Sequence, residues 1–184
     1  MLFAVIRSGN ADEVRALLAG DSELGNARTP EGATPALWAI YTGHADLVPL
    51  LLGSRAPDFF EACALGRTER IGELLSSDSA LINSHSADGF TALGFACFFK
   101  HLDAAKLLLA HGADASPGEG GGSTPLHTVA GHGNRQIIAR LLAAGADASA
   151  KANDGKTPAN IAVQYGHPEV VGQLVPKSNL ESIS

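Results

Sequence analysis

The chain contains 184 residues, of which 45% are hydrophobic, 17% charged and 5% aromatic. This composition is typical of a globular domain with a substantial core and unlike that of a disordered chain. Its net charge of −6, its pI near 5.6 and the lack of a basic stripe argue against nucleic-acid binding. No apolar run approaches the roughly 18 residues of a membrane-spanning helix, and the short apolar segment before Arg7 is interpreted as a helix rather than a signal peptide. We therefore expect a cytoplasmic protein with no nucleic-acid or membrane partner.

A repeat of 33 residues organises the chain. Thr91, Thr124 and Thr157 follow one another at that interval, and Thr34 opens a similar segment upstream. Six successive segments carry a leucine 17 positions after the start of the segment: Leu17, Leu51, Leu74, Leu108, Leu141 and Leu174. Agreement of this kind is the signature of a repeat architecture.

Each segment is predicted to form two short helices and a turn. The first helix begins after the Thr, which is a reasonable N-cap, and ends before a glycine nine positions later. The second helix carries its apolar residues on one face, which it can bury only by stacking on neighbouring units. We expect a single domain over residues 1–184, made of six units and a tail that frays, with boundaries near 1–28, 29–56, 57–86, 87–118, 119–151, 152–176 and 177–184.

The connection between the second and third units departs from the repeat. Thr34 and Pro57 are only 23 residues apart, ten fewer than the repeat length, so the hairpin finger found between other units must be absent or very short. Pro49 falls within the second helix of its unit, where it removes a backbone donor and crowds Ala45. This position predicts a kink or a late helix start, and together the two features predict an irregular joint near residues 49–58.

The stretch "SPGEGGGSTPLHTVAGHG", Ser116 to Gly133, raises the question of a phosphate-binding loop. A Walker loop requires a lysine before its Ser or Thr, and "GEGGGST" has none. The turn also has ordinary length, since Asp114 to Thr124 spans the same ten residues as Asp147 to Thr157. We interpret the stretch as a glycine-softened finger, and we predict that residues 117–122 form the most mobile of the three full fingers.

Three segments resemble ankyrin repeats: "DGFTALGFACFFKHLDAAKLLLAHGAD", "TPLHTVAGHGNRQIIARLLAAGAD" and "DGKTPANIAVQYGHPEVVGQLV". They match the family pattern of DG-x-TPLH-x-A, followed by GH, LL and GAD. The resemblance implies an all-α ankyrin-repeat solenoid of stacked helix-turn-helix units with short hairpin turns, capped by its first and last units. The phrase "FTALGFACFFKH" is similar to units common in bacterial proteins, so we expect a bacterial source.

The resemblance also implies structural roles for most histidines. His127, in "TPLH", is expected to hydrogen-bond between adjacent turns. Other repeated positions are held by His44, His101, His111 and His167. His132 differs, because it occupies a position where side chains vary, and we expect it to contribute to surface binding.

The cysteines and the recurring carboxylates fit structural roles as well. Cys63 and Cys97 occupy the same repeat position, and equivalent positions in stacked helices lie roughly 8–10 Å apart or more, beyond the reach of a disulfide. We expect reduced, buried thiols. Asp114 and Asp147 recur in the "GAD" turn and are interpreted as turn caps. No nucleophile, base and orienting group form a pattern, so no catalytic, cofactor-binding or metal-binding residue is predicted.

A concave binding surface follows from the resemblance, because ankyrin proteins bind other macromolecules through hairpin tips and first helices. The variable positions of that surface are rich in aromatic residues, which are typical interface anchors. The predicted partner-binding residues are Trp38, Tyr41, Phe90, Phe98, Phe99, His132, Lys156 and Tyr165. The competing interpretation is that Phe90 and Phe95 only pack between repeats.

We therefore predict a monomeric, non-enzymatic protein–protein interaction module that binds a protein partner through its concave groove and hairpin tips. Two alternatives stay open: an enzyme or small-molecule-binding protein with a site in the groove, and a purely stabilising homo-oligomer. An enzyme should show one concave cluster of perturbed titratable groups, whereas a module should show an aromatic patch with a polar rim. The sequence does not identify the partner, because one architecture binds unrelated targets.

Overall fold

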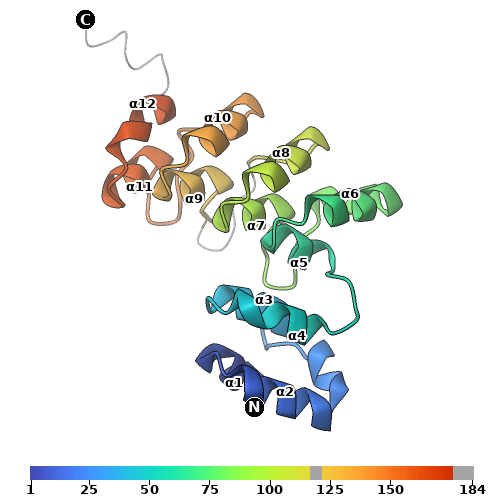
Figure 1. The fold of residues 1–184 in the computed structure, drawn as a ribbon. Helices are drawn as coiled ribbons and strands as arrows, with labels where there is room; N and C mark the ends of the chain where they lie inside the picture. The colour runs from blue at the N-terminus through green and yellow to red at the C-terminus, as the bar shows by residue number, and fades with distance from the viewer. Residues whose placement is uncertain (117–121, 176–184) are drawn as a thin grey trace, which may run out of the picture.

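The described part of the protein, residues 1–116 and 122–175 of the computed structural model, is all-α and contains no β-strand (Figure 1). In chain order its helices are α1 (Leu2–Ser8), α2 (Ala11–Gly20), α3 (Pro35–Tyr41), α4 (Val48–Leu52), α5 (Phe59–Ala64), α6 (Thr68–Ser77), α7 (Ala92–Phe98), α8 (Leu102–Ala110), α9 (Pro125–Gly131), α10 (Arg135–Ala143), α11 (Pro158–Gln164) and α12 (Val171–Leu174). Short 3-10 helices adjoin some second helices: η1 (Ser22–Asn26), η2 (Ala45–Leu47), η3 (Ser79–Asn83) and η5 (Pro168–Val170). The predicted tail at 177–184 and residues 117–121 of the predicted mobile finger lie outside the described residues.

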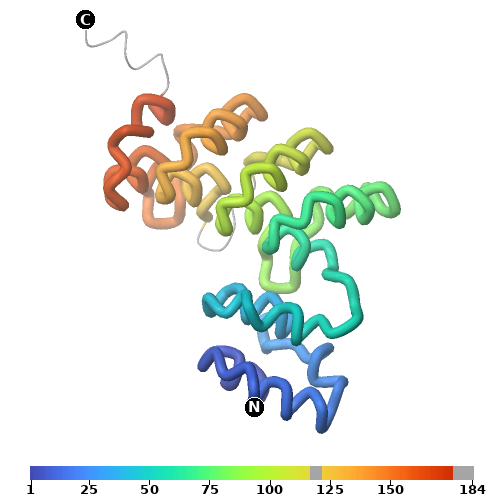
Figure 2. Tube along the Cα trace, viewed as in Figure 1, coloured from blue at the N-terminus to red at the C-terminus, as the bar shows by residue number. Residues whose placement is uncertain are grey.

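The helices stack in two rows that follow the length of the molecule (Figure 2). The first helices pack on one another from α1 through α3, α5, α7 and α9 to α11, and most second helices do the same alongside them. The second-helix row is interrupted between α4 and α6 (Figure 1). The predicted all-α solenoid is confirmed. Within the described residues, no helix has both the length and the apolar character needed to cross a membrane.

The threonines that open the units cap their first helices, as predicted. Thr34, Thr91 and Thr157 each accept a hydrogen bond on Oγ1 from the backbone N–H three residues later, at 3.0, 3.0 and 3.3 Å. In the units of Thr34 and Thr157 a proline follows directly and occupies the first helical turn, where no intrahelical donor is needed.

Glycines at the ends of the first helices are held in place by histidines of the next unit. Gly66 has a φ of +66°, and a Cβ atom there would lie 2.6 Å from Nδ1 of His101. Nε2 of His101 lies 2.9 Å from the carbonyl oxygen of Ala64, which links the two units. The same stacking recurs in the pairs Gly9–His44 and Gly133–His167. The structural role predicted for these histidines is confirmed.

The predicted irregular joint is present between α4 and α5. The short helix η2 precedes α4, so Pro49 falls in the first turn of α4, and the predicted late helix start is confirmed. Helix α5 begins after Asp58, one residue later than the repeat spacing from Pro57 predicts, because Asp58 is the residue that caps it. Residues 53–57 connect the two helices without a hairpin finger, as the missing ten residues indicate. The proposed unit boundaries stay a prediction.

Candidate protein-binding surface

The absence of a finger between the second and third units lets the two flanking fingers come into contact. The described fingers at residues 29–33, 86–90 and 152–156 are each closed by a backbone hydrogen bond. Since no finger stands between the first two, Ala87 lies against Gly32 so closely that Gly32 has no room for a side chain. The fingers at 29–33 and 86–90 therefore meet across the third unit.

Four of the aromatic side chains near this bridge form one cluster. Oη of Tyr41 donates a hydrogen bond to Oδ2 of Asp88 at 2.6 Å. The Tyr41 ring lies 6.4, 6.1 and 6.0 Å from the ring centroids of Phe90, Phe95 and Phe99, and Phe95 is buried. Three of the predicted partner-binding residues are therefore half-buried in contacts between units. Phe90 and Phe95 pack together with ring centroids 5.4 Å apart, and partner binding by Phe90 stays a prediction.

The side chain of Trp38 also makes its contacts within the fold. Its Nε1 donates to the carbonyl oxygen of Phe3 at 3.0 Å, and the two rings meet edge to face with centroids 6.2 Å apart. The side chain is half-buried and fastens α3 to α1. Trp38 therefore offers less free surface than its concave position suggests.

A hollow on the concave side brings together three other predicted residues, Phe98, His132 and Tyr165. It has a volume of about 340 Å³ and lies across the ends of α7, α9 and α11. The exposed fractions of Phe98 and Tyr165 are 46% and 63%, which is high for aromatic side chains, and Phe98 meets His132 edge to face at 6.3 Å. Gly131 forms part of the floor, since a Cβ atom there would lie 3.2 Å from Cγ2 of Ile161. The hollow thus presents two aromatic rings to solvent above a closely packed floor.

The walls of this hollow are nearly uncharged. Helices α7, α9 and α11 contain no Asp, Glu, Lys or Arg. Burial and the nearby charge of Lys100 lower the pKa of His132, against an opposing contact with the backbone of Cys97. The lowered pKa favours the neutral form of the His132 imidazole, and the surface is apolar and aromatic.

Lys156 stands on the finger at 152–156 and does not line the hollow, but its backbone contacts His127, which does. Its Nζ lies 2.8 Å from Oδ2 of Asp154, and its carbonyl oxygen is 3.0 Å from Nε2 of His127. Nδ1 of His127 accepts a hydrogen bond from the N–H of Thr124 at 3.1 Å. The hydrogen bond predicted for His127 between adjacent turns is confirmed.

Sequence reasoning missed Glu61, a fully buried carboxylate at the joint. Its oxygens accept two hydrogen bonds of 2.7 Å from the guanidinium of Arg55, one of 2.7 Å from Thr34 Oγ1 and one of 2.9 Å from the N–H of Asp58. Burial would raise the pKa of Glu61, but these donors outweigh it and the pKa is lowered; burial does raise the pKa of Asp58. The signal was present, because Asp58 and Glu61 have the spacing of a capping box, which the structure forms.

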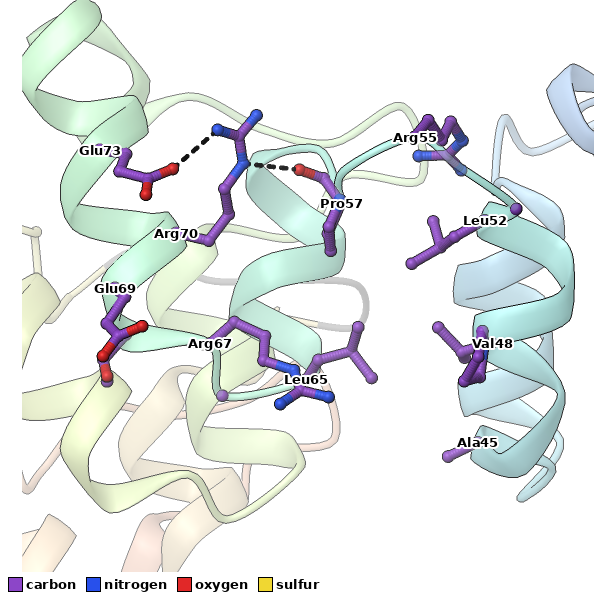
Figure 3. A pocket seen from close by; sticks show the side chains of 14 residues that line it. Ala45, Val48, Leu52, Arg55, Pro57, Leu65, Arg67, Glu69, Arg70 and Glu73 are labelled. Atoms are coloured by element: carbon purple, nitrogen blue, oxygen red, sulfur yellow. Dashed lines mark hydrogen bonds and ion pairs between the residues drawn. The ribbon is translucent and has the colours of Figure 1, made fainter.

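A second hollow, of about 620 Å³, opens at the joint itself (Figure 3). One wall is apolar and comes from Ala45, Val48 and Leu52, while the facing wall carries the charged side chains at the start of α6. Arg70 crosses part of this space, with Nε 3.1 Å from the carbonyl oxygen of Pro57 and Nη1 2.9 Å from Glu73. This hollow follows from the interrupted stacking of α4 and α6 and contains none of the predicted partner-binding residues.

The cysteines and aspartates considered as candidate reactive groups occupy structural positions. Cys63 and Cys97 are buried and form no disulfide, as predicted, and burial raises the pKa of the Cys63 thiol. Asp114 and Asp147 each accept a hydrogen bond of 2.8 Å from the N–H two residues later, which confirms them as turn caps. Among residues 1–116 and 122–175, no three His, Cys, Asp or Glu side chains are grouped as metal ligands.

Two family models match the chain. One, described as "Ankyrin repeats (3 copies)", matches residues 115–183, and the other, described as "Ankyrin repeats (many copies)", matches residues 59–109. Together they cover more than half of the chain, and the stacked helix pairs agree with them. The chain belongs to the ankyrin-repeat family. Ankyrin repeats are in general protein–protein interaction modules and are typically non-enzymatic.

Proposed function

We propose that this protein is a non-enzymatic module that binds a partner protein over the concave ends of α7, α9 and α11. The single observation that supports this most is the exposure of Phe98 and Tyr165 on either side of a hollow of about 340 Å³ whose helices carry no charge. Exposed aromatic side chains on a rigid surface are typical anchors of interfaces. The other predicted residues then have different parts: His132 lines the hollow, Lys156 contacts its wall through His127, and Trp38, Tyr41, Phe90 and Phe99 pack within the fold.

The test is capture of binding proteins from the lysate of the source organism with the full chain and three variants. Phe98→Glu and Tyr165→Glu place a charge in the hollow and should each reduce capture of the same protein at least about 10-fold, as expected for anchor residues. Val163→Glu is the matched control, since Val163 is 61% exposed on α11 but does not line the hollow. Capture that survives both aromatic substitutions, in variants with unchanged helical melting, would overturn the proposal.

We also propose that residues 1–184 form one domain of six units that acts as a monomer in the cytoplasm. Light scattering after size exclusion should then give the mass of a single chain, 18.8 kDa. A larger mass that persists on dilution would favour the homo-oligomer instead.

A further inference from the structure

Lys100 stands where the other units have glycine. It lies nine residues after Thr91, and its counterparts are Gly9, Gly43, Gly66, Gly133 and Gly166. Its φ is +64°, and it is the single non-glycine residue with a positive φ in residues 1–116 and 122–175. This left-handed conformation is strained for a residue with a side chain, so the lysine makes the turn less stable than glycine would.

The neighbouring unit explains why a lysine can be accommodated here. At Gly66 and Gly133 a histidine of the next unit lies over the glycine and leaves no room for a Cβ atom. The residue in the corresponding place above Lys100 is Asn134, which instead caps α10 by accepting from the N–H of Ile137. The side chain at position 100 is therefore permitted, but nothing in the stacking requires it.

The ammonium group of Lys100 also makes no contact within the described fold that would offset this strain. The side chain of Lys100 forms no ion pair or hydrogen bond with the rest of the described residues, although its backbone does bond within the turn. It follows Phe98, which lines the hollow at the end of α7, by two residues, so its backbone stands beside the concave hollow. Because α7, α9 and α11 carry no carboxylate, the positive charge has no partner in the walls of the hollow.

We propose that the hollow binds an acidic segment of the partner protein, in which one large apolar side chain lies between Phe98 and Tyr165 and a neighbouring carboxylate pairs with Lys100. This inference rests on the proposed function and specifies the chemistry of the partner. The volume of about 340 Å³ suits a single large side chain rather than a helix. A carboxylate fits better than a phosphate, since phosphate recognition favours clustered arginines with bidentate geometry, and α7, α9 and α11 carry none.

The test uses three blocked dipeptides as probes: acetyl-Phe-Glu-amide, acetyl-Phe-Gln-amide and acetyl-Phe-phosphoserine-amide. Each is titrated into the full chain while the amide resonances of Lys100, Gly131 and Tyr165 are followed by NMR. The Glu peptide should bind about 2–5-fold more tightly than the Gln peptide at low salt, the range of an exposed ion pair. That preference should vanish at about 0.5 M salt, where the Debye length is only a few ångströms.

Two variants separate the charge of Lys100 from its backbone strain. Lys100→Gln removes the charge and keeps the strained side chain, so it should abolish the Glu preference without a gain in Tm. Lys100→Gly should abolish the same preference and raise Tm by about 2–4 °C, because glycine adopts the left-handed conformation without strain. A gain in stability together with a loss of the preference for the Glu peptide cannot result from misfolding.

Several outcomes would overturn the inference. These are equal binding of the Glu and Gln peptides, a preference that survives in Lys100→Gln, tighter binding of the phosphoserine peptide, and no binding of any probe. The proposed function fails separately, when both Phe98→Glu and Tyr165→Glu still capture the lysate partner. If Phe98→Glu loses that partner and Lys100→Gln keeps it at full affinity, the binding surface stands and only the acidic specificity is wrong.

Discussion

Glu61→Gln should test whether the buried carboxylate holds the joint between the second and third units together. The wild-type side chain accepts four hydrogen bonds, two of them from the guanidinium of Arg55 at 2.7 Å. Glutamine has nearly the same size and keeps one acceptor oxygen, which suffices for Thr34 or Asp58. Its amide NH₂ group, however, then faces donors, and the charge that attracts Arg55 is gone.

The expected loss of stability follows from the burial of the two partners. Removing one member of a buried ion pair costs about 3–5 kcal/mol, because the other charge is left uncompensated. Here Glu61 is fully buried, but the side chain of Arg55 is 33% exposed and can turn towards water. Discounting the loss for this solvent access, we expect Glu61→Gln to lower the free energy of unfolding by about 2–3 kcal/mol.

The assay is urea denaturation followed by circular dichroism, with Glu73→Gln as the matched control. Glu73 also pairs with an arginine, Arg70 at 2.9 Å, but its side chain is 65% exposed, so the control should lose no more than about 1 kcal/mol. A loss in Glu61→Gln no larger than that in Glu73→Gln would refute the argument from burial.

The pH dependence of the difference gives a second check. The pKa of Glu61 is lowered in the folded protein, since its donors outweigh burial, so the ionised form is favoured by folding. Its stabilisation is complete above the ordinary glutamate pKa and is lost as pH falls through the lowered value. The gap between wild type and Glu61→Gln should therefore be full near neutral pH and shrink on acidification, whereas a gap that widens would contradict the assignment.

Three further predictions concern other contacts. Gly66→Ala and Gly43→Ala both introduce left-handed strain of about 1–2 kcal/mol. Only at Gly66 does the new methyl group displace a stacked histidine, which should add about 1 kcal/mol to the loss of stability. Equal losses for the two variants in urea denaturation would contradict this. Tyr41→Phe removes the hydrogen bond to Asp88 and should cost about 1 kcal/mol, with faster amide exchange in the finger at 86–90, which this bond ties to α3; unchanged exchange there would show that the bond does not hold the finger. The thiol of Cys63, whose pKa is raised by burial, should react with a thiol reagent only as the protein unfolds, so prompt labelling of the native chain is the opposing result.

The features that the sequence predicted well are those decided by local chemistry repeated in each unit. A threonine that caps a helix, as Thr34 and Thr91 do, needs only the next three residues to act. The late start of α4 follows from Pro49 alone, because proline has no N–H to give. Each of these effects extends over a single turn, so the repeat spacing was enough to place it.

The contacts that the sequence did not predict join segments distant along the chain. Tyr41 and Asp88 are separated by 47 positions, and their hydrogen bond depends on how far the finger at 86–90 reaches back to the end of α3. Glu61 likewise needs the path of the linker to bring Arg55 back to it. The local sequence pattern could identify Glu61 as half of a capping box, but it could not show that Glu61 also accepts hydrogen bonds from Arg55 and Thr34.

The missing finger also explains why the candidate binding surface is shorter than the predicted one. Across the third unit Tyr41, Phe90 and Phe99 pack into one cluster, so these rings are half-buried in contacts between units. Phe98 contacts this cluster through Phe99, with ring centroids 4.9 Å apart, yet both Phe98 and Tyr165 stay exposed. One deletion of about a finger's length in the sequence thus divides a single aromatic stripe into a structural part near α3 and an accessible part along α7, α9 and α11.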